Sequence, residues 1–385
     1  MEQKRLGYGW MRLPLTNPDD RSSVDIERAK RLADEFLAHG FSYFDTAYIY
    51  HNGQSERILR ECVVERYPRE RFTVATKMPM LNLKKPEDQV RIYEDQKKQL
   101  GVDFFDYYLL HNLNSSCYDR ALELGTIDYL REKKKKGEIR HLGFSFHDTA
   151  AYLDKILTEN PDFEFVQLQI NYLDWDSTGV QSRLCYETAR RHGKWVVVME
   201  PCKGGTLAQV PPAAEQLLRE AHPDWSPASW AIRFAAGLPD VQMVLSGMSD
   251  EEQLSDNMSF MEDFVSLTEE EEKLLFRVRD ILQESIAIPC TGCRYCVEGD
   301  RCPQNIAIPN YFSLYNVEQL DTNPSWSSQE EYYKNLLKQN YGRAGDCIEC
   351  HQCEEICPQH IDVTGWLKKV SERFDEGIGE WRPWR

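Results

Sequence analysis

The 385-residue sequence has no long apolar segment and is poor in basic residues relative to acidic ones. No apolar run approaches the roughly 18 residues that a membrane-spanning helix needs, and the opening MEQKRLGYGW lacks the apolar core of a signal peptide. Lys and Arg number 46 against 63 Asp and Glu, a formal net charge of −17. Because phosphates repel a negative surface, nucleic acid and anionic membranes are disfavoured as partners. We expect a cytoplasmic protein.

Cysteine is scarce in the first three quarters of the chain and dense in the last. Four of the 12 cysteines precede residue 290, and the other eight fall between Cys290 and Cys357. Disulfides are uncommon in the cytoplasm, so the dense group requires another explanation. The change in composition predicts two domains, one over residues 1–265 and one over residues 266–385. The second would begin with a linker helix, for which Thr268 is the expected N-cap.

Strand-like and helix-like segments alternate through the first domain. Amphipathic stretches of helical period, such as 24–39, 84–100 and 118–136, separate the strand candidates. Eight strands alternating with helices over about 260 residues predict an α/β fold of the (β/α)8 TIM-barrel type. A doubly wound sheet is disfavoured, because Gly7 and Gly9 lack the third glycine of a dinucleotide-binding turn. The strand candidates are 5–10, 41–46, 72–77, 105–111, 141–146, 165–171, 195–200 and 241–247.

The clustered cysteines form two similar motifs. Cys-x2-Cys-x2-Cys with a later Cys-Pro is typical of [4Fe-4S] ligation in bacterial ferredoxins. Structural zinc is the alternative, but zinc usually takes one C-x2-C pair from each half of its site. The spacing therefore favours two iron–sulfur clusters. The first motif comprises Cys290, Cys293, Cys296 and Cys302, and the second comprises Cys347, Cys350, Cys353 and Cys357.

Resemblance to two-cluster ferredoxins implies how the ligands are shared, because there the fourth cysteine of each motif serves the other cluster. Cys357 would then join the first three cysteines, Cys290, Cys293 and Cys296, and Cys302 would join Cys347, Cys350 and Cys353. The first motif departs from the pattern by a five-residue gap before Cys302. Helical patterns at 308–320 and 328–339 fill the long spacer between the motifs, so we expect a small α-helical, ferredoxin-like domain.

Polar residues stand where several strand candidates end, and active sites of such barrels lie at the strand ends. Asp45, Lys77 and His111 follow this rule, and Tyr50 lies five residues beyond Asp45. Residues 1–262 resemble the aldo-keto reductase superfamily, and the cysteine motifs add resemblance to its iron–sulfur-bearing branch. The motifs that carry the resemblance are FDTAYIYHNGQSE (44–56), VATKM (74–78), YYLLHNL (107–113), HLGFSFHD (141–148), VQLQINYLD (166–174) and LSGMSDEEQLSDN (245–257).

The resemblance implies an oxidoreductase that interconverts a carbonyl and an alcohol on a small molecule, using NAD(P)H. Tyr50 would donate the proton and Lys77 would stabilise its phenolate, because a tyrosine of pKa about 10 is otherwise a poor acid–base group. Asp45 would hold the Lys77 ammonium by an ion pair. His111 would donate a hydrogen bond to the carbonyl oxygen.

The same resemblance implies the cofactor contacts, with two departures. Phe146 and Met199 stand where the family has an asparagine and often a tyrosine, and His147 is the candidate replacement for the missing amide. Arg12 is a candidate anion or cofactor contact, with a surface ion pair as the alternative. The implied contacts are Ser145 and Gln167 on the nicotinamide, Ser246 and Gly247 at the phosphate site, and Gln253 and Asn257 on the adenine side.

Gly247 and Gln253 stand where the family often has cations for the 2′-phosphate of NADPH, and Glu251 and Glu252 are close by. NADH is therefore the favoured dinucleotide. Two other functions stay open. A flavin-dependent, ferredoxin-coupled reductase would hold FMN at the barrel's phosphate site, including the segment 203–205, because a flavin links two-electron and one-electron carriers. A non-catalytic electron carrier would use the barrel to dock a redox protein partner.

Overall fold

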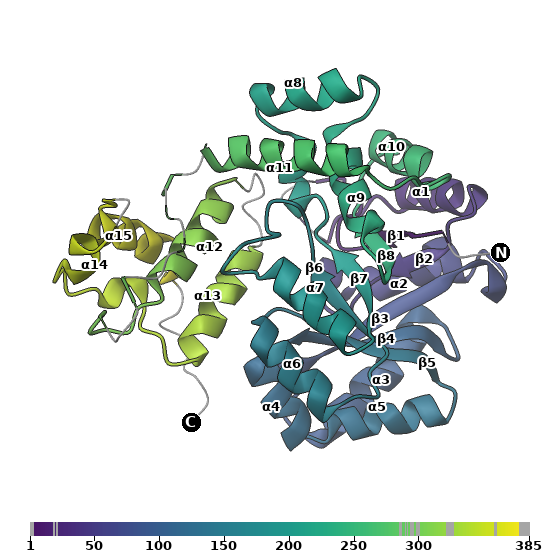
Figure 1. The fold of residues 1–385 in the computed structure, drawn as a ribbon. Helices are drawn as coiled ribbons and strands as arrows, with labels where there is room; N and C mark the ends of the chain where they lie inside the picture. Colours follow the sequence, from purple (N-terminus) through teal and green to yellow (C-terminus); the bar gives the residue numbers. More distant parts are fainter. Residues whose placement is uncertain are drawn as a thin grey trace.

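The computed structural model of the chain describes residues 4–17, 20, 22–284, 287–288, 290, 292, 296–297, 301–320, 327–357 and 360–376. Its N-terminal part is a closed barrel of eight parallel strands that pair in chain order, with β1 closing the ring against β8 (Figure 1). The predicted (β/α)8 fold is confirmed. The strands are β1 (Leu6–Gly9), β2 (Tyr43–Asp45), β3 (Thr73–Pro79), β4 (Phe105–Leu113), β5 (Ile139–Phe146), β6 (Phe165–Gln169), β7 (Trp195–Met199) and β8 (Val241–Ser246).

Alternate strand residues form the inside of the barrel, because successive side chains of a strand point to opposite faces. One interior layer is apolar, and polar or sulfur-bearing side chains lie two residues further along the same strands, where they line a cavity. Because of this alternation, the functional side chains lie at the strand ends, directly above the packed apolar layer. The apolar layer includes Tyr43, Ala75, Leu109, Phe165 and Val197. The residues above them are Asp45, Lys77, His111, Gln167 and Met199.

Helices cover the outside of the barrel, and side chains cap several of them. Asp25, Thr149 and Asp250 accept hydrogen bonds from first-turn backbone N–H groups of α1, α6 and α10. The predicted linker helix is α11, where Thr268 and Glu271 form a capping box. The helices are α1 (Ile26–Ala38), α2 (Ser55–Leu59), α3 (Pro86–Leu100), α4 (Ser115–Glu123), α5 (Thr126–Lys135), α6 (Ala150–Glu159), α7 (Ser182–Arg191), α8 (Pro212–Ala221), α9 (Pro227–Gly237), α10 (Glu251–Met261) and α11 (Glu269–Glu284).

One predicted helix is divided in the structure. The sequence pattern predicts a single helix over 118–136, but α4 ends at Glu123 and α5 begins at Thr126. Between them Gly125 has a φ of 65°, a left-handed conformation that glycine adopts without a steric penalty. Both helices bury side chains, so the apolar period continues through the break and conceals it.

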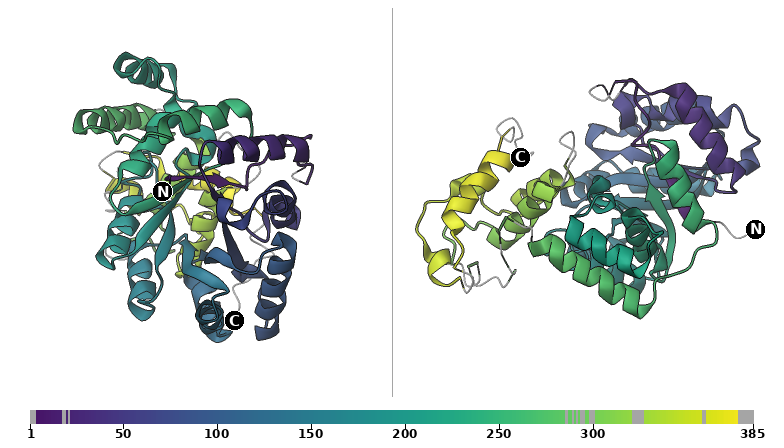
Figure 2. Two further views of the ribbon diagram at one scale, coloured as in Figure 1. Left: turned by 90° about the vertical axis from the view of Figure 1, so that its right-hand side faces the viewer. Right: turned by 90° about the horizontal axis from the view of Figure 1, so that it is seen from above.

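The C-terminal part is helical and has a hydrophobic core of its own. Tyr311, Phe312, Tyr333, Leu367 and Phe374 are buried there. Figures 1 and 2 show this part beside the barrel, with α12 and α13 nearest to it. The predicted helical region after the barrel is confirmed, and the division of the chain at residue 265 stays a prediction. The helices are α12 (Ile308–Leu320), α13 (Ser328–Lys338), α14 (Gln352–Glu355) and α15 (Val363–Phe374).

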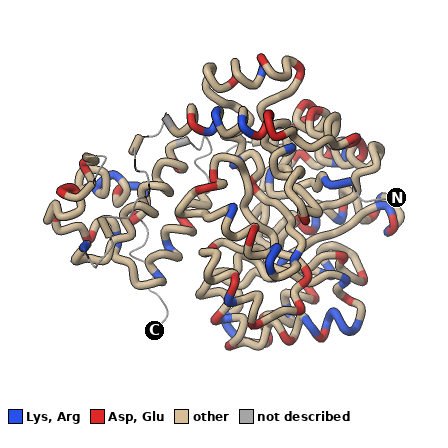
Figure 3. The backbone as a smooth tube through the Cα atoms, viewed as in Figure 1, with Lys and Arg blue, Asp and Glu red and all other residues tan. Residues whose placement is uncertain are grey.

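Basic and acidic residues alternate along the backbone in both parts of the molecule, and neither sign is confined to one part (Figure 3). The lysines on α5 show this locally, because Lys133 contacts Glu94 and Glu138, and Lys135 contacts Glu132. In the described part of the chain, no helix is long and apolar enough to cross a membrane.

Candidate active site and cluster-binding region

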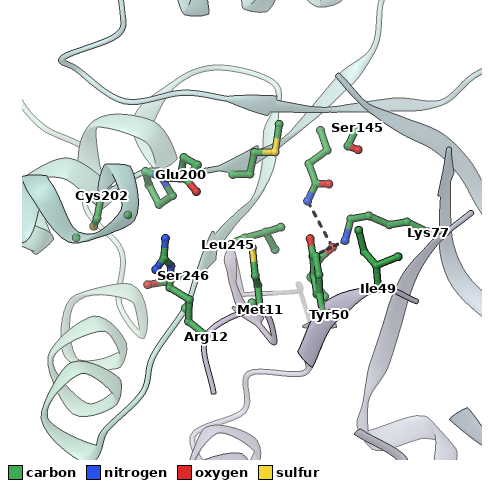
Figure 4. A pocket seen from close by; sticks show the side chains of 18 of the residues that line it. Met11, Arg12, Ile49, Tyr50, Lys77, Ser145, Glu200, Cys202, Leu245 and Ser246 are labelled. Atoms are coloured by element: carbon green, nitrogen blue, oxygen red, sulfur yellow. Dashed lines mark hydrogen bonds and ion pairs between the residues drawn. The ribbon is translucent and has the colours of Figure 1, made fainter. Parts of the chain in front are cut away.

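A cavity of about 680 Å³ opens at the C-terminal ends of the strands, where active sites of such barrels lie. All four residues of the predicted tetrad and all six predicted cofactor contacts line it. Figure 4 shows Tyr50 and Lys77 side by side on one side of the cavity, and Arg12 extending into it from the loop after β1. The structure therefore brings the sequence-predicted barrel residues together in one place.

A buried ion pair is the centre of the tetrad. Lys77 Nζ lies 2.6 Å from Asp45 Oδ1 and donates a second hydrogen bond of 2.8 Å to the carbonyl oxygen of Thr46. The Lys77 side chain is 1% exposed. Tyr50 begins a 3₁₀ turn (Tyr50–Gly53) after β2, and its ring centroid is 5.3 Å from Lys77 Nζ. The His111 ring meets the Tyr50 ring edge-on, at 5.8 Å between centroids.

Burial controls the protonation of the four groups. It raises the pKa of Asp45 and lowers that of Lys77, and the contact between the two opposes both shifts. Burial, with the charges of Asp45 and Glu200, raises the pKa of Tyr50 above its ordinary value. Burial and the nearby Lys77 also lower the pKa of His111 well below its ordinary value. At neutral pH the site therefore holds a protonated phenol and an uncharged imidazole.

The two predicted nicotinamide contacts have hydrogen-bonding capacity left for a ligand. Gln167 Nε2 donates to Asp45 Oδ2 at 3.4 Å, whereas its buried Oε1 finds no partner in the described structure. Ser145 Oγ accepts a 2.8 Å hydrogen bond from the backbone N–H of Asn112, which leaves its hydroxyl hydrogen available. A carboxamide needs one acceptor for its NH2 group and one donor for its oxygen. These residues fit a nicotinamide.

The phosphate and adenine side of the cavity contains few charges. Asn257 Nδ2 donates to Ser246 Oγ at 2.9 Å, and Gln253 Oε1 accepts from the backbone N–H of Ser249 at 2.9 Å. A Cβ on Gly247 would lie 2.9 Å from Arg12 Cβ, so the glycine makes room for the Arg12 stem.

Arg12 is a cation on this side of the cavity. The sequence analysis left two roles open for it, an anion or cofactor contact and a surface ion pair. Its guanidinium makes no hydrogen bond or ion pair with the described residues, so a surface ion pair is not its role. Glu251, expected to repel a phosphate, is held by Arg28 at 2.5 Å, and this contact compensates its charge. An unpaired arginine inside a cavity is a contact for an anion.

The departures from the family pattern have separate structural explanations. Phe146 packs in the core beside Phe144 and does not reach the cavity, whereas the next residue, His147, lines it. Burial lowers the pKa of His147 to about 4, and its Nδ1 has no partner among the residues described. Met199 lines the cavity as well. Lys203 does not, because it is buried in an ion pair of 2.5 Å with Asp174.

The cysteines predicted for the second cluster lie together. Cys302, Cys347, Cys350 and Cys353 line one small cavity, whose apolar walls include Pro303, Ile306, Ile308 and Leu367. The backbone N–H of Ile306 donates to Cys302 Sγ at 3.5 Å, the kind of contact that tunes cluster thiolates. In the described ranges, no three His, Cys, Asp or Glu side chains form a site for a metal ion. The four thiols line the same small cavity, and thiolate is the ligand that a [4Fe-4S] cluster takes, so this donor set fits that group.

The cysteines predicted for the first cluster are described only in part. Cys296 is buried in the C-terminal core, and Cys290 and Cys357 pack against that core. Cys293 lies outside the described residues. This ligand set stays a prediction.

Among the cavity residues that the sequence analysis missed, one comes from outside the barrel. Glu331 of α13 lines the barrel cavity, although it lies in the C-terminal part of the chain. The signal that the sequence offered was the recurrence of polar and aromatic residues, Tyr332, Asn335 and Gln339, along one face of a helix. Nothing in that spacing says which surface the face meets.

Known proteins resemble both parts of the chain. The model of the aldo/keto reductase family matches residues 5–278, and that of the 4Fe-4S dicluster domain matches residues 289–361. The uncharacterized oxidoreductase YqkF of Bacillus subtilis (strain 168) is 25% identical over an alignment of 295 residues, which covers 66% of this chain and 89% of that protein.

Solved structures show the same barrel fold. The holo form of aldo-keto reductase AKR11C1 from Bacillus halodurans has a TM-score of 0.58 at 24% identity, covering 71% of this chain and 91% of its own. An aldo-keto reductase from Klebsiella pneumoniae in complex with NADPH has a TM-score of 0.56 at 18% identity, covering 73% and 95%. With the family match running through the whole barrel, the chain belongs to the aldo/keto reductase family and is an oxidoreductase that carries a C-terminal 4Fe-4S dicluster domain.

Proposed function

We propose that the enzyme reduces the carbonyl group of a small molecule to an alcohol, or catalyses the reverse reaction. The observation that carries this proposal is the buried Lys77–Asp45 pair next to Tyr50 and His111, all at one cavity. A carbonyl that accepts hydride develops negative charge on its oxygen and then takes up a proton. The four side chains supply both a proton and positive or dipolar groups at the same place.

Each residue of the tetrad has a separate role in this reaction. Tyr50 stays protonated because of its burial and donates its proton to the carbonyl oxygen. The Lys77 cation, held in place by Asp45, stabilises the phenolate that remains. The uncharged His111 ring donates a hydrogen bond that orients the carbonyl and disperses charge on its oxygen.

NAD(P)H, when bound, would supply the hydride. Ser145 and Gln167 would hold its carboxamide, as their unused donor and acceptor indicate. Ser246, Gly247, Gln253 and Asn257 line the remainder of the cavity and would contact the ribose, phosphate and adenine. Arg12 would contact the pyrophosphate, which NADH and NADPH share. Because Gly247 and Gln253 offer no cation to a 2′-phosphate, NADH is the favoured dinucleotide.

The C-terminal domain would hold two [4Fe-4S] clusters and exchange electrons with the barrel or with another protein. Cys302, Cys347, Cys350 and Cys353 would hold one cluster, and Cys290, Cys293, Cys296 and Cys357 the other. Around the second motif Cys350 is exposed and Ile348 is 58% exposed, so that cluster would lie near the surface. A redox protein partner would make contact there.

FMN is the second candidate for the barrel cavity. Arg12 would provide a cation for its phosphate, and Met199 leaves the ring site without the stacking tyrosine of the family. Lys203 is part of the phosphate-binding segment expected from the sequence, but it forms an ion pair with Asp174 and would not contact the FMN phosphate. A flavin that dissociates from the unfolded holoenzyme would favour this alternative, in which electrons reach the substrate from the clusters.

The test compares two tyrosines of one loop. Tyr50→Phe should lower turnover of a carbonyl substrate by about 10²–10⁴-fold, the usual contribution of a general acid, with iron content unchanged. Tyr48→Phe is the matched control, because the Tyr48 hydroxyl donates to Asp95 on α3 and is not in the cavity. Equal rates in the wild type and Tyr50→Phe would refute the assignment and favour the electron-carrier alternative.

A further inference from the structure

Helix α13 of the C-terminal domain lies between the two hydrophobic cores (Figures 1 and 2). Tyr333 and Leu336 are buried in the C-terminal core. Tyr332 belongs to the same core and also reaches the barrel, where its ring meets the His147 ring edge-on at 5.8 Å. The helix therefore belongs to both parts of the molecule.

Hydrogen bonds fix α13 on the loop after β5 and on the first turn of α4. Asn335 Nδ2 donates to the carbonyl oxygen of His147 at 2.6 Å, and Gln339 Nε2 donates to Asp148 Oδ1 at 3.0 Å. Lys338 Nζ donates to Ser116 Oγ of α4 at 2.9 Å. The contacted segments follow β5 and β4, the strands that carry Ser145 and His111.

The cavity of the tetrad extends to this helix. His147, held by α13, and Glu331, on α13, both line it. The Glu331 side chain is 25% exposed, and its carboxylate lies 3.3 Å from Lys334 Nζ. That ammonium is closer to Glu330, at 2.7 Å, so the Glu331 carboxylate keeps acceptor capacity toward the cavity.

The other polar groups near the catalytic end of the cavity include a second carboxylate, Glu200, and several neutral amides. Asn52, Asn82 and Asn112 line it, and Asn112 Oδ1 is buried without a partner in the described part of the chain. Amide and carboxylate oxygens accept hydrogen bonds from hydroxyl and ammonium groups, whereas a ligand carboxylate meets only repulsion from Glu331.

We propose that the iron–sulfur domain completes the substrate pocket of the barrel, and that Glu331 selects carbonyl compounds that carry a hydrogen-bond donor, a hydroxyl or an ammonium, away from the reacting carbon. This inference rests on the proposed carbonyl chemistry of the barrel. It assigns to the domain a role in substrate recognition that is independent of electron transfer.

The test measures binding of four rigid, matched aldehydes to the holoenzyme by saturation-transfer NMR. They are benzaldehydes with a hydroxymethyl, dimethylaminomethyl, methyl or carboxylate group in the 4-position. A hydrogen bond to a charged group changes affinity by about tenfold or more. We expect the hydroxymethyl and dimethylaminomethyl compounds to bind about tenfold more tightly than the methyl compound, and the carboxylate to bind most weakly.

Two variants of neighbouring residues decide the outcome. Glu331→Leu should remove the preference. Glu330→Gln, one position away on the same helix but outside the cavity, can still accept a hydrogen bond from Lys334 and should retain the preference. Glu331→Gln should weaken the dimethylaminomethyl preference more than the hydroxymethyl one, because the amide oxygen still accepts a hydrogen bond but no longer attracts the ammonium charge. Equal affinities for all four aldehydes in the wild type, or an unchanged preference in Glu331→Leu, would overturn the inference. The proposed function fails separately, if Tyr50→Phe turns over these aldehydes at the wild-type rate.

Discussion

The barrel and the C-terminal domain assemble their functional groups in different ways. In the barrel, Asp45, Lys77 and His111 are more than 30 residues apart in the chain and meet because paired parallel strands end together. In the C-terminal domain, Cys347, Cys350 and Cys353 follow one another at two-residue intervals, and only Cys302 comes from a distance.

The difference concerns what holds each site together. The barrel site is fixed by strands, by a packed apolar layer and by an ion pair of 2.6 Å, so it exists before any ligand binds. The thiols line a cavity bordered mainly by loops and short helices. Metal–thiolate bonds in such regions are themselves part of the folding free energy. Perturbing the two sites should therefore have different consequences.

The largest expected effect is at the cysteines. Protein purified without air should contain about eight irons, from two four-iron clusters, and Cys302→Ser should lose about four of them. Helices α12 and α15 should lose stability because their core borders the cysteines. Cys62→Ala, a change of a buried barrel thiol, should retain all the iron. Iron and acid-labile sulfide analysis gives the result. Full iron in Cys302→Ser would contradict the ligand assignment, and stoichiometric zinc would contradict the clusters.

The next effect is at the buried cation of the barrel. Lys77→Met should lower turnover by about 10²–10⁴-fold, because the phenolate of Tyr50 loses its stabilising charge, while iron content stays unchanged. Lys203→Met is the matched control, since it also breaks a buried Lys–Asp pair, with Asp174, but outside the cavity. Both variants should lose stability. If both lose turnover equally under conditions in which both are folded, Lys77 has only a structural role.

A carboxyl group behind the tetrad should make barrel stability depend on pH. Glu56 accepts hydrogen bonds from Thr76 and Gln96, and Gln96 also donates to the carbonyl oxygen of Lys77. Burial raises the pKa of Glu56 to about 7. The folded state therefore keeps a proton that the unfolded state releases, so the free energy of unfolding falls as pH rises from about 4.5 to 7.

Glu56→Gln removes this dependence. The variant should match the wild type near pH 4.5 and exceed its free energy of unfolding at pH 8 by up to about 3 kcal/mol, from roughly 1.4 kcal/mol per unit of pKa. Glu164→Gln should have the opposite effect, because burial raises the pKa of Glu164 but contacts with His141 and Lys134 outweigh it and lower the pKa to about 2. Urea unfolding between pH 5 and 8 shows the effect of Glu56→Gln as a changed slope with pH, and that of Glu164→Gln as a loss already present at pH 5, because Glu164 titrates below about pH 4.5. Parallel curves for the wild type and Glu56→Gln would contradict the assignment.

The sequence predicted what depends on periodicity or short spacing. Eight strand candidates, the positions of Lys77 and His111 at strand ends and the two cysteine motifs follow from patterns that a chain displays locally. The sequence could not predict properties that depend on a contact with a residue distant in the chain. The engagement of Lys203 by Asp174 and the approach of Glu331 to the barrel are examples, because each follows from packing between segments whose arrangement no local pattern encodes.

The smallest expected effect is at Arg12. The sequence and the structure point to different residues as determinants of dinucleotide binding. The sequence pointed to Gly247 and Gln253, which lack charge, as a reason for NADH to bind at least as well as NADPH. The structure adds Arg12, whose aliphatic stem packs on Gly247 and whose guanidinium has no partner among the described residues. If Arg12 contacts the pyrophosphate, Arg12→Met should weaken both dinucleotides by about tenfold, or 1.4 kcal/mol, and leave their ratio unchanged.

The control for this measurement is Arg190→Met, which alters an arginine that contacts Asp240 outside the cavity and should change either affinity less than twofold. Titration of the holoenzyme with NADH and NADPH, followed by nucleotide fluorescence, gives both dissociation constants. A wild type that binds NADPH tenfold more tightly, with the preference lost in Arg12→Met, would show that Arg12 contacts the 2′-phosphate instead. The cation that the family places after β8 would then have been replaced by one from the loop after β1.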